Sequence, residues 1–457
     1  MRIAKLKLRN FRQFKDFEID FTNPSTGEPV ETSCCIGANG TGKSTIMGLL
    51  VQAVNARNLQ SIPDKGNLEP GSVAAVKLWS EEAEMWVLST PQSTAHLSPD
   101  VEQSEPWKKL WDPNTSTTWN RTFSQTLWTP LHKAYADRNG TQAKFALKNS
   151  SNDLLIYAPP DGKSLSAGAL PSSNLNKATG YFKQVPYYHV TSYDSVQNFW
   201  TFLIYQIAKR ENDEKEFMKR PEIKQLKVID AEALFAKQFP EILSTLSAHW
   251  NLILDKAGLV FDIENAVIPV QLNDNLQAYV KSKVSNQRVT YNQLSTGIRN
   301  FLFRIGHIHS LYFNREIKRG FLFVDEPELS LFPDVLYELI ETYINLTQNT
   351  QAFFATHSPI VASQFQPFER VIFEFDDKGY VRARKGVAPK GDDPNDLLKK
   401  DFNVRTLYGA EGNKNWLRFL ELKKEIKEKK DGTDPSTVEE YLRIGNDYGF
   451  PMADEIP

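Results

Sequence analysis

The stretch at residues 37–44, with the sequence GANGTGKS, constrains the fold of this chain more than any other segment. A short apolar run at 32–36 precedes it, and the residues at 45–54 that follow have one apolar face at helical spacing. Strand, glycine-rich loop and helix in this order form a phosphate-binding loop, because the glycines turn backbone N–H groups inward and the helix N-terminus adds partial positive charge. We predict that Lys43 reaches the β- and γ-phosphates of a nucleotide and that the Ser44 hydroxyl binds the accompanying Mg²⁺. The alternative is a glycine-rich turn that matches by chance.

Composition indicates an ordinary globular protein. The 457 residues leave room for two or three domains, or for one large domain with insertions, with 40% hydrophobic and 24% charged residues. The net charge of −2 gives no general attraction to nucleic acid or anionic lipid, so any such surface would be a local patch. We see no membrane-length apolar run and no signal peptide, and the adjacent Cys34 and Cys35 favour neither a disulfide framework nor structural zinc. We therefore expect a cytoplasmic protein without a membrane anchor.

The first half of the chain reads mainly as strands. We predict strands at 2–8 and 17–21 and a hairpin of strands at 73–79 and 85–88. Residues 90–180 are rich in Ser, Thr, Asn, Pro and Trp without a sustained helical period, which predicts an antiparallel β-insertion with long loops and strands at 145–147 and 154–158. Four tryptophans there would stack on nucleic-acid bases or, as is commoner, pack the loops down; they are Trp107, Trp111, Trp119 and Trp128.

The second half alternates between helix and strand signals. A strand at 185–190 leads into a helical region, strongest at 198–210 and 231–257, and then into two or three short strands before Tyr291. Beyond 294, alternating helices and strands predict a mostly parallel sheet. The helices are expected at 298–313 and 335–347, and the strands at 320–324, 352–355 and 371–375. A mostly helical tail, clearest at 416–430, ends the chain.

Two adjacent carboxylates, Asp325 and Glu326, follow the apolar run at 321–324. An acid at the carboxyl end of a parallel strand lies at the edge of the sheet where a phosphate loop opens. We expect Asp325 to hold the Mg²⁺, directly or through water, and Glu326 to orient and polarise the water that attacks the γ-phosphate. The alternative is a pair of acids that begins a surface turn.

Two further segments carry polar groups suited to the same chemistry. The strand expected at 352–355 ends in Thr356-His357, and a neutral His357 would donate a hydrogen bond to the γ-phosphate or the attacking water. The alternative is a structural histidine, which is the commoner role of a lone one; the other six histidines suggest no catalytic role. Ser295 is a suitable N-cap for the long helix that follows, where free N–H groups form a second anion site, although alone it is only a helix start.

In this order, the motifs resemble those of ABC-type ATPases. The loop at 37–44 corresponds to Walker A, the LSTG segment at 294–297 to the signature, 321–326 to Walker B, and His357 to the switch histidine. The signature differs from the LSGG of transporters. No Q-loop glutamine is certain, although Gln184 and Gln197 flank the strand at 185–190.

Two other segments, 10–14 (NFRQF) and 325–333 (DEPELSLFP), are similar to those of the SMC, RecF and OLD branch rather than of transporters. The chain length and helical tail most resemble the stand-alone ATPases of bacterial anti-phage systems, the Septu PtuA type above all. The resemblance implies that ATP lies between two head-to-tail subunits, the signature of one closing over the Walker A loop of the other. It implies ATP and Mg²⁺ as cofactors and these ATP-binding residues: Arg12, Gly37, Asn39, Gly40, Thr41, Gly42, Lys43, Ser44, Thr45, Ser295 and Gly297.

The same resemblance implies a separately encoded nuclease partner, of the HNH type, with nucleic acid bound directly or through it. Residues 410–413 (AEGN) faintly resemble the first motif of a Toprim nuclease, but no Asp-x-Asp follows, so no nuclease is expected in this chain. Two alternatives stay open. One is a RecF- or SMC-like DNA-repair ATPase, and the other is a nucleotide-sensing scaffold with little turnover.

We therefore expect an α/β protein with an ABC-type ATPase core, an antiparallel β-insertion and a helical lobe. The expected parts are an ATPase lobe with Walker A and the insertion at 1–190, a helical lobe at 191–290, an ATPase lobe with signature, Walker B and switch histidine at 291–390, and a helical tail at 391–457.

Overall fold

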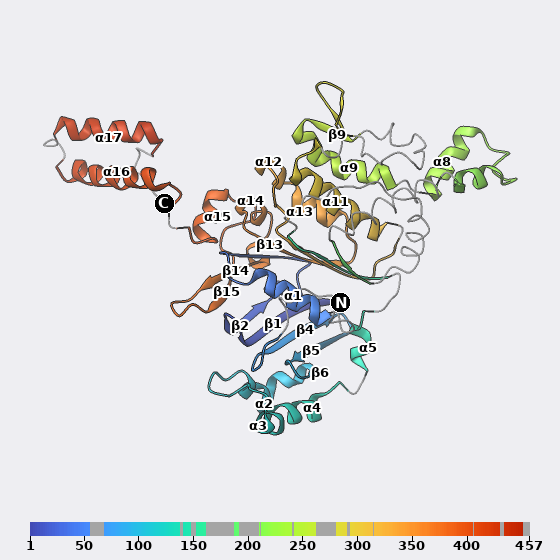
Figure 1. Ribbon diagram of the computed structural model, residues 1–457, viewed down its shortest axis with the longest axis horizontal. Coiled ribbons are helices and arrows are strands. Elements are labelled where there is room, and N and C mark those ends of the chain that lie inside the picture. The colour runs from blue at the N-terminus through green and yellow to red at the C-terminus, as the bar shows by residue number, and fades with distance from the viewer. Residues whose placement is uncertain are drawn as a thin grey trace. The chain divides into compact units, whose positions relative to one another are not determined.

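A seven-stranded, mostly parallel sheet carries the phosphate loop (Figure 1). Its order is β15-β14-β3-β13-β12-β7-β8, and every neighbouring pair is parallel except β14 and β15. This confirms the predicted parallel sheet. The strands are β3 (Thr32–Gly37), β7 (Asp153–Ala158), β8 (Tyr188–Val190), β12 (Arg319–Asp325), β13 (Thr350–Thr356), β14 (Arg370–Phe375) and β15 (Val381–Lys385).

The computed structural model describes residues 1–54, 68–137, 140–147, 152–160, 187–191, 210, 212–239, 242–261, 280–289, 293–313, 315–404, 406–429 and 434–450. The chain forms two units, Met1–Gly391 and Asp392–Pro457. The expected four-part division of the chain stays a prediction. Within the described residues, no helix is long and apolar enough to cross a membrane.

Helices cover both faces of the parallel sheet, which explains why its central strands are continuous apolar runs (Figure 1). One face packs against α1 (Lys43–Val54), and the other against α11 (Thr296–Tyr312) and α13 (Leu339–Asn345). Almost every residue of α11 after its first turn is buried, as expected of a helix enclosed on all sides. The single helix predicted at 335–347 is instead two helices, because α12 (Pro333–Leu336) ends before α13 begins.

A second sheet, antiparallel, packs against the far side of α1 (Figure 1). Its order is β2-β1-β4-β5-β6, and it contains the strands predicted at 2–8 and 17–21 and the predicted hairpin at 73–88. One core of buried side chains runs from this sheet through α1 to the parallel sheet, so α1 is held from two sides. The strands are β1 (Arg2–Phe11), β2 (Phe14–Asp20), β4 (Val73–Ser80), β5 (Ala83–Ser89) and β6 (Thr94–Leu97).

The segment after β6 is helical, which corrects the predicted run of loops and strands. The predicted strand at 145–147 is wrong because Phe145 ends a helix, whereas the one at 154–158 is β7 of the parallel sheet. The helices are too short for a helical period to show in the sequence. They are η3 (Pro99–Gln103), α2 (Glu105–Leu110), α3 (Arg121–Phe123), the π-helix η4 (Ser124–Trp128), α4 (Thr129–Tyr135) and α5 (Thr141–Phe145).

The tryptophans of this segment pack its short helices together, which confirms the commoner of the two predicted roles. Trp107 and Trp128 are buried, and the half-buried Trp111 and Trp119 pack against the same core. The Trp107 ring lies 5.1 Å from the ring of Trp86 on β5, centroid to centroid. These side chains therefore attach the helices to the antiparallel sheet.

The predicted helical lobe and its short strands are present where the structure describes them. Two helices, α8 (Val228–Gln238) and α9 (Ile242–Leu254), precede a sheet of β9 (Leu259–Phe261), β10 (Val280–Ser282) and β11 (Arg288–Val289). The buried Trp250 of α9 donates a hydrogen bond from Nε1 to the carbonyl oxygen of Leu302 on α11, at 3.1 Å. Apart from Arg210, the helix expected at 198–210 lies outside the described residues.

The described part of the Asp392–Pro457 unit is mostly helical, as predicted. They are α15 (Pro394–Lys400), α16 (Ala410–Lys429) and α17 (Pro435–Tyr448). A small core of Phe419, Leu422, Ile444 and Phe450 joins α16 to α17. The predicted helix at 416–430 begins earlier, at Ala410.

Candidate functional site

Three neighbouring strands of the parallel sheet end at one edge, in the order β3, β13, β12. Ile36 of β3 pairs with Thr356 of β13, and Ala355 of β13 pairs with Asp325 of β12. The strands run in the same direction, so the phosphate loop, Thr356-His357 and Asp325-Glu326 follow adjacent strand ends. The crossovers therefore bring together residues about 280 to 320 positions apart in the sequence.

The phosphate loop takes a conformation that depends on its glycines. Gly40 and Gly42 have φ angles of +81° and +88°, in the left-handed region that side chains disfavour. A Cβ atom on Gly42 would also lie 2.4 Å from Nε2 of Gln13 and 2.6 Å from Cζ of Phe14. Within the loop, the buried Thr41 hydroxyl donates to the carbonyl oxygen of Ala38 at 2.8 Å. The loop is thus shaped by its own residues and by the turn between β1 and β2.

Lys43, the first residue of α1, is 6% exposed and donates from Nζ to the carbonyl oxygen of Gly37, at the start of the loop, at 2.9 Å. Burial lowers the pKa of its ammonium group, and the negative charges of Asp325, Glu326 and Glu328 oppose that change. The carboxylates after β12 therefore lie within electrostatic range of Lys43. Such a lysine, held by carbonyl groups at the start of a helix, fits a polyphosphate.

The acidic pair is placed at the end of β12. The side chain of Asp325 is 1% exposed, whereas Glu326 is half-buried and donates its backbone N–H to the carbonyl oxygen of Ala355 at 2.8 Å. Glu326 has a φ of +47°. This conformation costs about 1–3 kcal/mol for a residue with a side chain, and residues that adopt it cluster at functional sites. The Ser44 hydroxyl and the Asp325 carboxylate are hard oxygen donors, the ligand type that suits Mg²⁺.

His357 is exposed, directly after the last residue of β13. Partial burial lowers the pKa of its imidazole, as does the charge of Lys43, while Glu326 opposes them. The imidazole is therefore neutral at neutral pH and able to donate one hydrogen bond. The backbone N–H of His357 donates to Oε1 of Glu328 at 2.8 Å. Glu328 had no expected role, although it lies in the DEPE sequence already singled out.

The turn between β1 and β2 contacts the loop and the start of α1. The exposed guanidinium of Arg12 lies 3.4 Å from the hydroxyl of Thr45 and 3.3 Å from a carboxylate oxygen of Glu69. Gln13 donates from Nε2 to the carbonyl oxygen of Gly40 at 3.1 Å. The structure thus places Arg12 beside the loop. It also adds Gln13, for which the sequence predicted no role although it lies in the same NFRQF segment.

The signature residues form a separate group. Ser295 is exposed and caps α11, accepting a hydrogen bond from the backbone N–H of Ile298 at 3.4 Å. Gly297 is buried against the backbone of Ser330. Of the contacts described for Ser295 and Gly297, none reaches the loop at 37–44. Gln184 and Gln197, the two considered for a Q-loop, lie outside the described residues.

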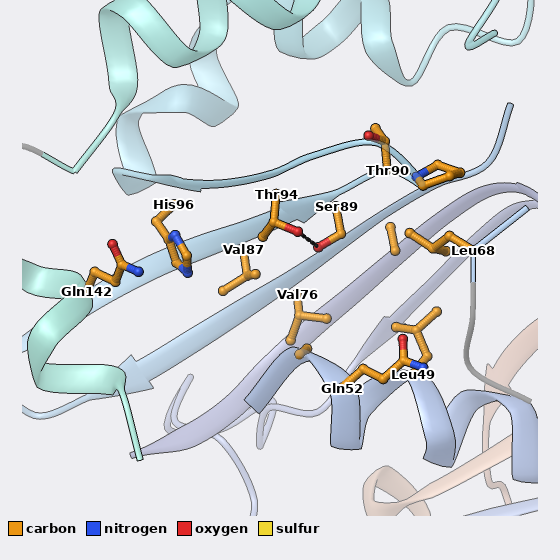
Figure 2. Close-up of a pocket in the computed structure, with 13 residues that line it drawn as sticks. Leu49, Gln52, Leu68, Val76, Val87, Ser89, Thr90, Thr94, His96 and Gln142 are labelled. Atoms are coloured by element: carbon orange, nitrogen blue, oxygen red, sulfur yellow. Dashed lines mark hydrogen bonds between the residues drawn. The ribbon is translucent and has the colours of Figure 1, made fainter. Parts of the chain in front are cut away.

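A pocket of about 400 Å³ lies elsewhere, between α1 and the strands β4, β5 and β6 (Figure 2). Figure 2 shows Leu49 and Gln52 of α1 on one side and Val76, Val87 and Thr94 of the sheet on the other. Of the described residues that line this pocket, none is an acid, a lysine or an arginine. This pocket therefore offers no charged group to a triphosphate, and the ends of β3, β13 and β12 are the candidate site.

A strand, phosphate loop and helix beside an acidic strand end define a nucleotide-binding domain of the phosphate-loop type. The chain belongs to the AAA ATPase domain family, whose model matches residues 1–362.

Among solved structures, the chain is similar to several SMC heads. One is an SMC head bound to the C-winged helix domain of ScpA, at 12% identity and a TM-score of 0.40, covering 84% of this chain and 98% of that one. A second is the SMC head domain from Thermotoga maritima, at 10% identity and a TM-score of 0.40, covering 85% and 100%. A third is the SMC head with an extended coiled coil bound to the C-terminal domain of ScpA from Pyrococcus furiosus, at 13% identity and a TM-score of 0.38, covering 84% and 96%.

Proposed function

We propose that this chain binds Mg-ATP at residues 37–44 and hydrolyses it at the edge of the parallel sheet. The observation that carries the proposal is the pairing of β3, β13 and β12, whose ends bring Lys43, His357 and the acidic pair Asp325-Glu326 to one place. Membership of the AAA ATPase domain family supports it.

Each side chain has a role that follows from its position. The Lys43 ammonium neutralises the β- and γ-phosphates, and Ser44 and Asp325 hold the Mg²⁺, which supplies further charge neutralisation when bound. Glu326 accepts the proton of the attacking water, and neutral His357 donates a hydrogen bond to the γ-phosphate or to that water. The ATP-contacting backbone and side chains are those of Arg12, Gly37, Asn39, Gly40, Thr41, Gly42 and Thr45.

The signature residues act from a second subunit in this proposal. Ser295 is exposed at the N-terminus of a 17-residue helix, where backbone N–H groups and the helix dipole favour an anion. In a head-to-tail pair, Ser295 and Gly297 of one chain would close over ATP bound to the loop of the other.

We propose further that the nucleotide state of this pair controls a separately encoded nuclease, of the HNH type, in anti-phage defence. The support is the resemblance of the motifs at 10–14 and 325–333, the chain length and the helical tail to the Septu PtuA type of ATPase. A ligand shifts a complex between two states only through its different affinity for each, so the ATP-bound and ATP-free forms would hold the nuclease differently. The Asp392–Pro457 unit is the candidate docking element. DNA-stimulated hydrolysis without a nuclease partner would instead favour a RecF- or SMC-like ATPase.

ATP binding and turnover by two variants test the ATPase proposal. Lys43→Ala should abolish ATP binding, because its ammonium group reaches back to the start of the loop and supplies the cation there. Glu326→Gln should keep ATP binding and lower kcat by about 10²- to 10⁴-fold, since an amide cannot accept the proton. Lys77→Ala is the matched control, because Lys77 is half-buried in the antiparallel sheet and pairs with Glu84 and Glu102.

Wild-type ATP affinity in Lys43→Ala would show that the loop assignment is wrong. Normal turnover by Glu326→Gln would move the catalytic base elsewhere, with His357 the next candidate. A wild-type chain that binds ATP with negligible turnover would favour the scaffold alternative.

A further inference from the structure

A single carboxylate oxygen joins the segments that follow β12 and β13. Oε1 of Glu328 accepts a hydrogen bond from the Thr356 hydroxyl at 2.7 Å and another from the backbone N–H of His357 at 2.8 Å. The Thr356 hydroxyl in turn accepts from the backbone N–H of Ser358 at 2.9 Å. Glu328 thereby fixes the backbone on both sides of the His357 side chain.

The same turn connects Glu328 to the acidic pair. Glu328 is two residues beyond Glu326, and the backbone N–H of Leu329 donates to the carbonyl oxygen of Glu326 at 3.2 Å. A shift of this turn would therefore move Glu326 and His357 together. The contact of Glu328 thus acts together with the hydrogen bond from the Glu326 backbone N–H to Ala355 in setting the distance between the proposed base and the proposed hydrogen-bond donor.

Retaining a carboxylate at this position is costly for the fold. Burial raises the pKa of Glu328, and the hydrogen bonds from His357 and Thr356 oppose that rise. Its second oxygen, Oε2, is buried and has no hydrogen-bond partner among the residues that the structure describes. A buried carboxylate with one oxygen unsatisfied destabilises the folded state relative to an apolar side chain of similar size. Fold stability alone thus gives no reason for a glutamate here.

We propose that Glu328 is a positioning residue, which holds His357 in the place where its imidazole meets the γ-phosphate or the attacking water. The proposal rests on the proposed ATP hydrolysis. Glu328 acts through its hydrogen bonds to Thr356 and His357, and ATP affinity resides in the loop around Lys43. Loss of the contact should consequently lower kcat and leave the affinity for ATP almost unchanged.

The experiment measures kcat, KM and thermal stability for substitutions at Glu328, alone and combined with His357→Ala. Glu328→Ala should lower kcat by about 10- to 100-fold, the loss expected when a reacting group is misplaced by about 1 Å. KM should change by less than about threefold. Glu328→Gln keeps an acceptor oxygen for Thr356 and His357, so it should restore most of the turnover. In the His357→Ala background, Glu328→Ala should lower kcat no further, because the residue it positions is gone.

A matched control separates positioning from stability. Asp153 is a buried carboxylate, 1% exposed, that pairs with Arg319. The two residues are the first of β7 and of β12, so they lie at the end of the sheet away from the site. Asp153→Ala should lower the melting temperature and leave kcat unchanged. Where Glu328→Ala fails to fold, Glu328→Met, which keeps the side-chain length without an acceptor, takes its place.

Three results would overturn the positioning role in a chain that hydrolyses ATP. They are a wild-type kcat in Glu328→Ala, an equal loss of kcat in both His357 backgrounds, and a Glu328→Gln variant as slow as Glu328→Ala. A wild-type chain without turnover would instead overturn the proposed hydrolysis on which this role depends.

Discussion

Gly297 near the start of α11 lies directly against Ser330 in the turn after β12. A Cβ atom added to Gly297 would lie 1.9 Å from the carbonyl oxygen of Ser330 and 2.5 Å from its carbonyl carbon. Ser330 itself has a φ of +62°, so the turn is already strained where the helix meets it. The signature helix and the turn that carries Glu326 and Glu328 are therefore in contact within one chain.

This contact predicts the effect of a single methyl group. Gly297→Ala forces the Ser330 backbone to move, so we expect a loss of about 1–3 kcal/mol in the free energy of unfolding. ATP turnover should fall as well, since the same turn holds Glu326. Chemical denaturation and steady-state hydrolysis measure the two effects. Gly409→Ala is the control, because a Cβ atom there meets none of the described atoms within 4 Å. Equal stability of the two variants would contradict the tight contact.

Subunit mixing tests whether Ser295 acts on ATP bound to another chain. Ser295→Arg should block hydrolysis by placing a bulky side chain at the exposed start of α11, and Lys43→Ala should block ATP binding. In a mixed pair, one of the two composite sites has both halves intact. Half of the pairs in an equal mixture are mixed, so about a quarter of the wild-type turnover should return.

The control for the mixing experiment is Ser25→Arg, an exposed position in the loop between β2 and β3. It should be as active as wild type before and after mixing. Activity that fails to return in the mixture of Ser295→Arg and Lys43→Ala would place each site within a single chain.

Two buried histidines on α11 predict a loss of stability in acid. His307 packs against His189, and His309 against His249, with ring centroids 6.3 Å apart in each pair. Burial lowers the pKa of His307 to about 3 and that of His309 to about 4, and the charge of the facing histidine contributes less to each shift. Below about pH 6.5 the unfolded chain binds protons that the folded chain does not. The free energy of unfolding should therefore fall with pH by about 1.4 kcal/mol per unit for each histidine, until the folded-state pKa is reached.

Denaturation at several pH values checks this. Neither ring nitrogen of His307 has a hydrogen-bond partner among the described residues, so His307→Leu should keep full stability at pH 7 and reduce the acid slope. His132→Leu, at an exposed position on α4, should leave the slope unchanged. An acid slope in His307→Leu equal to that of the wild type would exclude His307 as its source.

Because the proposal assigns ATP hydrolysis to this chain and DNA cleavage to a separate nuclease, the purified chain should leave DNA intact. It should hydrolyse ATP and not cut plasmid DNA in Mg²⁺ or Mn²⁺, because the proposal assigns Ser44 and Asp325 to the nucleotide's metal. Cutting should begin when the product of a neighbouring nuclease gene is added, and Lys43→Ala and Glu326→Gln should alter it. Gel assays of plasmid cleavage provide the measurement. Cleavage by the pure chain that survives Asp325→Ala would reveal a nuclease site within it.

The sequence by itself determined the local part of the site. The loop at 37–44 is contiguous, so its glycines, Lys43 and the following helix could be recognised from neighbouring residues in the sequence. Strand ends were predictable for the same reason, since the apolar run at 321–324 and the acids after it lie next to each other. The alternation of strands and helices beyond 294 was sufficient to predict a parallel sheet, and hence that Asp325 and His357 meet at one edge.

Only the tertiary structure decided which distant side chains support that site. Gln13 reaches Gly40, Glu328 reaches Thr356 and His357, and Gly297 meets Ser330, each across 27 to 33 positions of sequence. Local periodicity carries no information about such pairs, because they depend on how strands and helices cross. The short helices between β6 and β7 escaped prediction for a related reason, since capping and packing of Trp107 and Trp128, rather than a sustained period, stabilise them. A helix of one or two turns forms only when tertiary contacts offset the cost of its nucleation, and those contacts exist only in the folded chain.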